Sequence, residues 1–123
     1  MKTIFLVEDN PFLIDIYKKK LEIAGFKLKI AETGGKAMHL LKEKAEEAPD
    51  LFILDIVLPE FDGWEILKSI KENPKFKNSK VIILSNLGQK EDIQKSQEMG
   101  ADKYLIKAHF VPSEIVEEIK KLI

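Results

Sequence analysis

The chain has 123 residues, of which 45% are apolar and 33% charged, as in a compact globular domain rather than a disordered segment. Twenty lysines nearly balance 21 acidic residues, giving a formal charge of -1, and there is neither arginine nor cysteine. This composition excludes disulfides and thiolate chemistry, and it leaves no excess positive charge to attract a nucleic acid.

Five short apolar runs predict strands at similar intervals along the chain, over residues 4–7, 26–30, 51–54, 81–84 and 104–106. The first, third and fourth runs are continuously hydrophobic, which is typical of parallel strands buried on both faces. The second alternates lysine with apolar residues, which favours an edge strand with one wet face.

Between these runs the apolar residues recur with the period of a helix. The first predicted helix begins at Pro11 and ends at Gly25, the second runs from about Ala37 past Ala48 to near Pro49, and the third stops before Asn73. A shorter, more polar helix follows around residues 93–100, and the last covers residues 115–122. Five strand–helix repeats without a linker favour an α/β fold, one open sheet with helices on both faces.

The apolar runs are all too short to cross a bilayer. The residues before the first strand, Met1–Thr3, lack the pattern of a secretory signal. We therefore expect a cytoplasmic protein with no membrane partner and no direct nucleic-acid partner.

Polar side chains follow four of the predicted strands: Glu8 and Asp9, Asp55, Ser85, and Lys107. In a doubly wound parallel sheet, ligands bind beyond the carboxyl ends of the strands, so we expect these side chains to converge at one edge. Taken singly, each also fits the start of a solvated loop.

Asp55 is the least ordinary of these residues, because a carboxylate here stands between two strongly apolar stretches. Close carboxylates at Glu8, Asp9 and Asp55 would repel one another, and Lys107 offsets only one negative charge. A divalent cation would offset the rest, and ligands that are all oxygens favour Mg²⁺ over Zn²⁺. Such a site, with the hydroxyl of Ser85 nearby, suits phosphoryl transfer onto a carboxylate.

With these residues, the sequence resembles the response-regulator receiver domain of two-component systems, the CheY-like family. The resemblance covers the whole chain. It implies one receiver domain over residues 1–123, with a flavodoxin-like (βα)5 doubly wound sandwich and a five-stranded parallel sheet in the order 2-1-3-4-5. Its motifs are the acidic pair Glu8–Asp9, the stretch Asp55–Gly63, Ser85, Gly100–Ala101 and Tyr104–Lys107.

The resemblance also assigns roles around the metal. It implies that Asp55 is the phosphoacceptor. It further implies that Asp9, Asp55 and the backbone carbonyl of Val57 bind Mg²⁺ directly, with Glu8 acting largely through water. On the residues alone, Asp9 or Asn10 equally fits a cap for the helix beginning at Pro11.

Ser85 and Lys107 would contact phosphoryl oxygens, and Ser85 and Tyr104 would form the switch. An ordinary strand aromatic that packs beneath a helix is the alternative for Tyr104. Asn86 stands where the family prefers a smaller residue, and it either narrows access to the phosphoryl group or adds an amide donor. Ala108 replaces the usual proline after the lysine, so the Lys107–Ala108 peptide is either trans, or cis and held by its surroundings.

The resemblance implies a signalling protein rather than an enzyme. Its phosphodonor would be a sensor histidine kinase or a histidine phosphotransfer protein, and its output an unidentified protein or a detached output domain. The alternative is a pseudo-receiver that keeps the fold as an interaction module without phosphorylation. A dehalogenase-type phosphotransferase would need an Asp-x-Asp motif after the first strand, and a nucleotide or flavin module a glycine-rich loop. Residues 8–10 provide neither.

Overall fold

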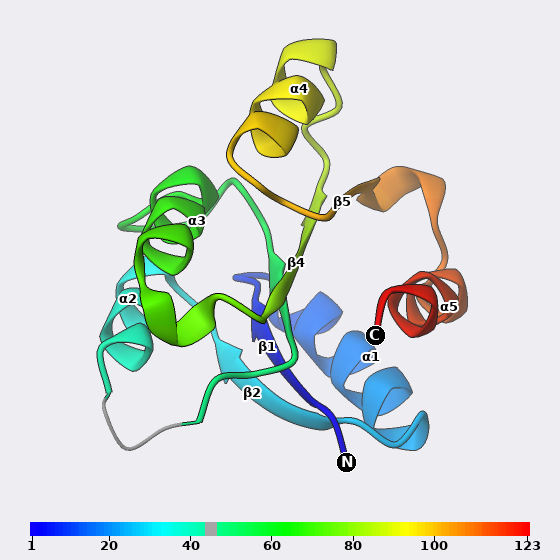
Figure 1. The fold of residues 1–123 in the computed structure, drawn as a ribbon. Helices are drawn as coiled ribbons and strands as arrows, with labels where there is room; N and C mark the ends of the chain where they lie inside the picture. The colour runs from blue at the N-terminus through cyan, green and yellow to red at the C-terminus, as the bar shows by residue number, and fades with distance from the viewer. Residues whose placement is uncertain (44–46) are drawn as a thin grey trace.

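The computed structural model describes residues 1–43 and 47–123. Five parallel strands form one sheet in the order β2-β1-β3-β4-β5, as expected (Figure 1). The strands are β1 (Thr3–Val7), β2 (Lys27–Ala31), β3 (Leu51–Leu54), β4 (Lys80–Ser85) and β5 (Lys103–Ile106). The helices are α1 (Pro11–Ile23), α2 (Gly34–Leu41), α3 (Gly63–Glu72), α4 (Lys90–Glu98) and α5 (Pro112–Leu122), with short 3₁₀ turns η1 (Pro74–Phe76) and η2 (Lys107–His109).

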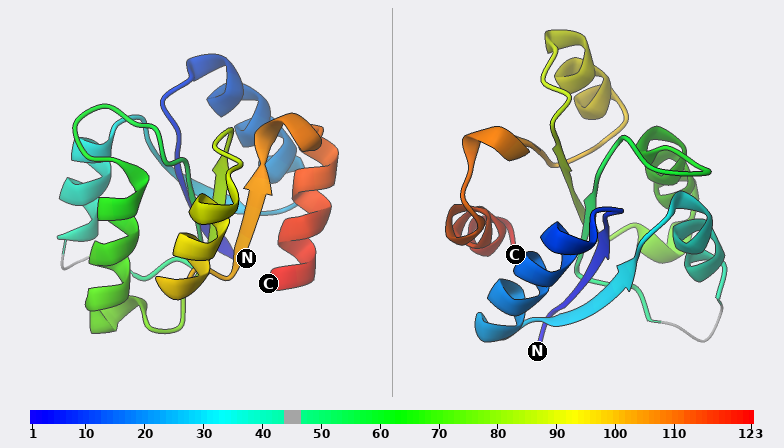
Figure 2. Two further views of the ribbon diagram at one scale, coloured as in Figure 1. Left: turned by 90° about the horizontal axis from the view of Figure 1, so that it is seen from above. Right: turned by 180° about the vertical axis from the view of Figure 1, so that it is seen from behind.

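Helices cover both faces of the sheet, with α1 and α5 on one face and α2 and α3 on the other (Figures 1 and 2). On the first face, buried residues of α1 and α5 such as Tyr17 and Ile119 pack against strand residues such as Leu6. On the second, residues of α2 and α3 such as Leu41 and Leu67 pack against a separate set. The three central strands are buried on both sides, which explains their continuously hydrophobic sequences.

The strand register places the ends of the strands side by side. Val7 pairs with Leu54, and Leu54 pairs with Ile83. The residues that follow β1 and β3 therefore lie at the same edge of the sheet as the last residue of β4, Ser85. This edge carries the polar side chains that the sequence singled out.

The predicted helices are correct in number and order, and two differ in detail. The second helix ends at Leu41 instead of near Pro49, and Ala48 is exposed and outside any helix; residues 44–46 lie outside the described part of the chain. In the fourth, the buried residue is Ser96 rather than its neighbour Gln97. An apolar period is a weak guide in this helix, because Ile93 is its only large apolar residue.

The predicted edge strand is confirmed, because β2 lies at one end of the sheet. Gly25 has a positive φ of 96° just past α1, as expected of a left-handed helix end. Among the described residues, no helix combines the length and the apolar character needed to cross a membrane.

Candidate functional site

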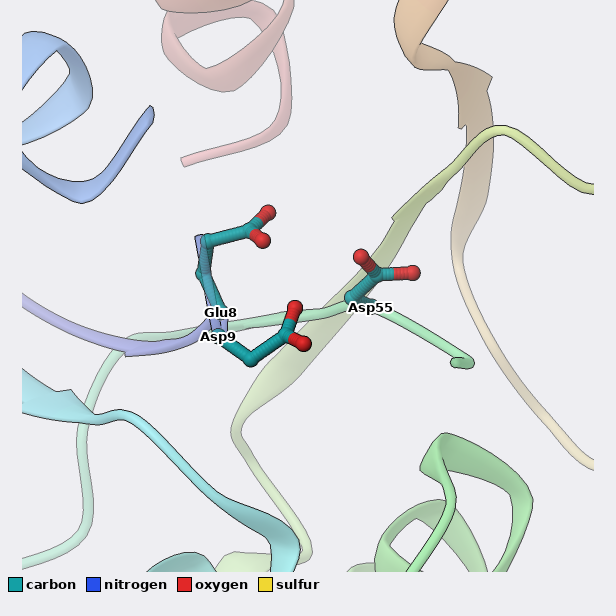
Figure 3. A group of neighbouring side chains, drawn as sticks. All are labelled: Glu8, Asp9 and Asp55. Atoms are coloured by element: carbon teal, nitrogen blue, oxygen red, sulfur yellow. The ribbon is translucent and has the colours of Figure 1, made fainter. Parts of the chain in front are cut away.

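Three carboxylates gather at the carboxyl edge of the sheet (Figure 3). Glu8 and Asp9 follow β1 and Asp55 follows β3, and one oxygen from each lies within 4.8 Å of the others. Glu8 and Asp55 are only 1% and 6% exposed, whereas Asp9 is open to solvent. The predicted convergence of these side chains is therefore confirmed.

Lys107, directly after β5, joins the two buried carboxylates. Its Nζ lies 2.5 Å from Oδ2 of Asp55 and 2.6 Å from Oε1 of Glu8. All three side chains are at most 10% exposed, so water screens these ion pairs much less than it screens pairs at the surface. Lys107 thus lies on the same edge of the sheet as the acidic cluster, as its position in the sequence predicted.

Backbone N–H groups complete the hydrogen bonding of the buried carboxylates. Oδ1 of Asp55 accepts from the N–H of Ile56 at 2.6 Å and from that of Val57 at 3.3 Å, and Oε2 of Glu8 accepts from the N–H of Asn10 at 3.1 Å. Sequence reasoning missed these donors, because every residue except proline carries a backbone N–H and no side chain marks them. The helix cap is settled as well: the Asn10 side chain accepts from the N–H groups of Phe12 and Leu13.

The protonation of this cluster reflects both burial and pairing. Burial raises the pKa of Glu8, and its hydrogen bond to Lys107 only partly opposes this effect. Burial lowers the pKa of Lys107, but the hydrogen bonds and charges of Asp55 and Glu8 outweigh it, so the net pKa is raised. The ammonium form of Lys107 is therefore the form that this structure stabilises.

A second set of contacts links Ser85, the last residue of β4, to β5. Ser85 is fully buried, and its Oγ accepts from the N–H of Leu87 at 3.3 Å. The carbonyl of Leu87 in turn accepts from the hydroxyl of Tyr104. Leu87 was not a predicted site residue, again because it takes part through its backbone.

Tyr104 is half-buried on β5, beside the loop that leads from β4 to α4. Burial, aided by the charges of Asp92 and Asp55, raises the pKa of Tyr104 to about 12. The phenol therefore keeps its proton and donates to Leu87, so Tyr104 does more than pack as a strand aromatic. Asn86, between Ser85 and Leu87, is exposed.

The peptide after Lys107 is trans, which decides between the two alternatives for Ala108. Lys107, Ala108 and His109 form the single 3₁₀ turn η2, which leads toward α5. The ion pairs of Lys107 with Glu8 and Asp55 are therefore made without a proline at position 108.

The chemistry of the donor set fits Mg²⁺. The cluster offers carboxylate oxygens without nitrogen or sulfur, the ligands that this cation prefers in proteins. With its three carboxylates ionised, the cluster has two more negative charges than Lys107 neutralises, and a divalent cation carries the matching charge. The solvent-open side chain of Asp9 leaves a route for the ion to enter.

The chain is similar to several known proteins. A family model described as the response regulator receiver domain matches residues 4–120. Over all 123 residues, the chain is 30% identical to the DNA-binding dual master transcriptional regulator RpaA of Synechocystis and covers 49% of that protein. It is 29% identical over 119 residues to the polar-differentiation response regulator DivK of Brucella ovis, which is 97% of this chain and 94% of DivK. Among solved structures, the Mn²⁺-bound form of response regulator Rcp1 matches with a TM-score of 0.87 and 29% identity, covering 98% of this chain and 93% of that one.

The chain belongs to the response regulator receiver domain family. This family defines a signalling module of two-component phosphorelays, in line with the predicted class. The chain spans about half of RpaA. It spans only 24% of a probable cyclic di-GMP phosphodiesterase of Vibrio cholerae, to which it is 36% identical over 110 residues.

Proposed function

We propose that this chain accepts a phosphoryl group on Asp55 in a Mg²⁺-dependent reaction. Phosphorylation would then change the surface that binds a partner protein, and so relay the signal. The observation that carries the proposal is the placement of Asp55. Its carboxylate is nearly buried at the end of β3, lies beside two further carboxylates, and is paired with Lys107 at 2.5 Å. An aspartate placed in this way combines a nucleophilic oxygen with a fixed positive charge.

The donor would be a phosphohistidine of a sensor histidine kinase or of a histidine phosphotransfer protein. A carboxylate oxygen of Asp55 attacks phosphorus, the phosphorus–nitrogen bond breaks, and the imidazole leaves with the electron pair of that bond. The hydrogen bonds of Ile56 and Val57 to Oδ1 orient the carboxylate for this attack. Asp9, Asp55 and the carbonyl of Val57 would hold Mg²⁺ directly, with Glu8 acting through water. When bound, the ion supplies positive charge to the phosphoryl oxygens.

Lys107, Ser85 and Asn86 would contact the transferred phosphoryl group. Lys107 is divided between Glu8 and Asp55 before the reaction, and a phosphoryl group on Asp55 would give its ammonium a stronger partner. Ser85 would turn its hydroxyl toward a phosphoryl oxygen. Ser85 ends β4, the strand next to β3 and its acceptor Asp55. Lys107 follows β5, which lies one strand further along the sheet.

The switch would run from Ser85 to Tyr104 through Leu87. Because Ser85 accepts from the N–H of Leu87 and Tyr104 donates to its carbonyl, a shift of the Ser85 hydroxyl changes both contacts. An acyl phosphate adds a charge of about -1 to -2 at the site, which is enough to bias such a local equilibrium. The surface formed by α4, β5 and α5 would then bind an output protein or a detached output domain.

In this function residues 1–123 act as one receiver domain, a signalling partner and not an enzyme. Phe12, in the first turn of α1 and three residues after Asp9, is 73% exposed and offers a partner an apolar contact. The partner kinase would take its phosphoryl group from ATP, which is found in the cytoplasm, so the transfer to Asp55 would take place there. The proposal includes no contact with nucleic acid or membrane.

Mass spectrometry of the protein after incubation with Mg²⁺ and acetyl phosphate tests the proposal. We expect the mass to rise by one phosphoryl group, and hydroxylamine, which cleaves acyl phosphates, to reverse the gain. Asp55→Asn and a sample with a metal chelator should show no gain. A wild type that stays unmodified would instead support the pseudo-receiver, and continuous release of phosphate would support an enzyme.

A further inference from the structure

The loop between the phosphoacceptor and α3, residues 56–62, is held by the backbone at two places. At its far end, the N–H of Gly63 donates to the carbonyl of Ile56 at 2.8 Å. In its middle, the carbonyl of Pro59 accepts from the N–H of Gly34 at 3.0 Å. Gly34 is the first residue of α2, so a helix that contributes no side chain to the acidic cluster contacts the loop next to it.

The approach of α2 to this loop depends on glycine at position 34. A Cβ atom there would lie 1.9 Å from the carbonyl oxygen of Phe61 and 2.7 Å from the carbonyl carbon and nitrogen of the same residue. These are all backbone atoms, so no side-chain rotation relieves the contact. Gly34 is not among the glycines with positive φ, so the close approach, and not a need for left-handed backbone, is what demands glycine here.

Gly35, the next residue in the same helix, provides a contrast. A Cβ at Gly35 would also be close to the loop, 2.5 Å from Oε1 of Glu60, but this neighbour is the end of a flexible side chain. The two glycines therefore differ in what an added methyl group would displace. At Gly34 it would displace the loop backbone, and at Gly35 only a carboxylate that can rotate away.

The loop has a conformation that needs outside support. Glu60 has a φ of 72°, and among the described residues it is the only one other than glycine with a positive φ. This region is sparsely populated by side-chain-bearing residues and persists where the surrounding structure holds it. Gly34 supports the loop on both sides of Glu60. It donates a hydrogen bond to the carbonyl of Pro59, the residue before Glu60, and it lies close to the backbone of Phe61, the residue after it.

We propose that Gly34 is a positioning residue for the metal site. By fixing residues 59–61, it fixes the backbone of Val57, whose carbonyl is the one proposed Mg²⁺ ligand that belongs to this loop. This inference rests on the proposed function, because it takes the Mg²⁺ site from there. It adds that the start of α2, on a different segment of the chain, sets the affinity of that site.

The test compares Gly34→Ala with Gly35→Ala, because both changes replace glycine by alanine in the first turn of the same helix. Backbone amide NMR spectra of the metal-free proteins report the loop, and a Mg²⁺ titration of the same samples gives the Kd. In Gly34→Ala we expect shifted amide signals over residues 57–62 and a Kd about tenfold or more above that of the wild type, the range seen when supports of metal ligands are removed. In Gly35→Ala we expect a Kd within about twofold of wild type, because the Glu60 side chain rotates away.

A further variant, Thr33→Ala, keeps the proposal testable if Gly34→Ala does not fold. Oγ1 of Thr33 accepts from the N–H of Lys36 and caps α2, so its loss frays the turn that contains Gly34 without adding an atom. We expect the Mg²⁺ Kd of this variant to rise by up to about fivefold. Unchanged Mg²⁺ affinity in every folded variant at positions 33 and 34 overturns the inference alone. A wild type that does not bind Mg²⁺ contradicts the proposed function and removes the inference with it.

Discussion

The helices α4 and α5 follow neighbouring strands, yet they are attached to the sheet in different ways. α5 buries Ile115, Val116 and Ile119, and the ion pair between Lys103 and Glu118 at 3.4 Å also ties it to β5. The one buried residue of α4 is Ser96, whose hydroxyl donates to the carbonyl of Ile93 in the same helix. In Figure 1, α4 stands out from the rest of the molecule, whereas α5 lies against α1.

Because of this difference, the residues of the candidate site that precede α5 are held more firmly than those that precede α4. Lys107 lies at the junction of β5 and the firmly packed α5, whereas Ser85 and Leu87 lead into the lightly packed α4. Between α4 and its neighbour α3, the structure shows a cation–π contact, with Nζ of Lys95 4.5 Å from the centre of the Trp64 ring. Contacts of this kind at the surface contribute on the order of 0.5–1 kcal/mol, less than burial of one large aliphatic side chain. In the proposed switch, a shift of Ser85 would therefore act on the helix that is easier to move.

Of the side chains at the ends of β4 and β5, Lys107 should contribute most to stability. Replacing Lys107 by Met leaves Glu8 and Asp55 as buried carboxylates without their cation, and such a loss costs about 3–5 kcal/mol of unfolding free energy. Ser85→Ala removes the bond at 3.3 Å from the N–H of Leu87 and a contact with the Tyr104 hydroxyl, neither of which involves a charged group, and should cost about 1 kcal/mol. Urea unfolding of the metal-free proteins, followed by circular dichroism, measures both values.

Added Mg²⁺ should restore part of the stability of Lys107→Met, because a ligand that binds only the folded state stabilises it. Equal losses of unfolding free energy in Lys107→Met and Ser85→Ala would contradict the view that the Lys107 side of the site is held more firmly than the Ser85 side.

The buried side chains of α5 and α4 should also differ in what they contribute to stability. Ile119 is fully buried in α5, and Ile119→Ala should lower the free energy of unfolding by about 2–5 kcal/mol through lost packing and a residual cavity. Ser96→Ala in α4 removes a bond within the helix and should cost less than about 1 kcal/mol. The same urea titrations provide the measurement. A cost for Ser96→Ala as large as that of Ile119→Ala would show that α4 is anchored as firmly as α5.

The unequal packing of the two helices also explains which parts of the fold could be predicted from the sequence. Ile115, Ile119 and Leu122 recur at helical spacing because burial selects apolar residues, so the last helix was predicted closely. In α4 the buried position is a serine, and in the second helix the apolar Ala48 lies beyond the end at Leu41, so the same pattern misled. An apolar pattern in the sequence therefore reveals a packed helix only where large apolar side chains are buried.

A similar division applies to the candidate site. The side chains at the strand ends, Asp55 and Lys107 among them, were predictable because parallel strands bring their carboxyl ends to one edge. The contributions of Leu87, Ile56 and Gly34 were not, since they are made by backbone groups or by the absence of a side chain. Those of Leu87 and Gly34 depend on distances between segments that lie apart in the sequence, and that of Ile56 on how the backbone turns next to Asp55.

The hydroxyl of Tyr104 on β5 donates to the carbonyl of Leu87, in the loop that leads from β4 to α4. The pKa of Tyr104 is raised from 10.0 to about 12, so the fold favours the protonated phenol. The stability that follows from this shift is fully present below pH 10 and is lost as the pH rises from about 10 to 12. In Tyr104→Phe this part of the loss is absent, and unfolding free energies should fall less steeply with pH in that window than in the wild type.

Ultraviolet titration of tyrosinate gives an independent check of the same group. The protein has two tyrosines, and burial also raises the pKa of the other, Tyr17. Little ionisation is therefore expected near pH 10 while the fold is intact, and the difference between wild type and Tyr104→Phe isolates the Tyr104 phenol. Ionisation of Tyr104 near pH 10 in the folded protein would mean that its hydroxyl is open to water and not bonded to Leu87. The proposed path from Ser85 through Leu87 to Tyr104 would then be broken.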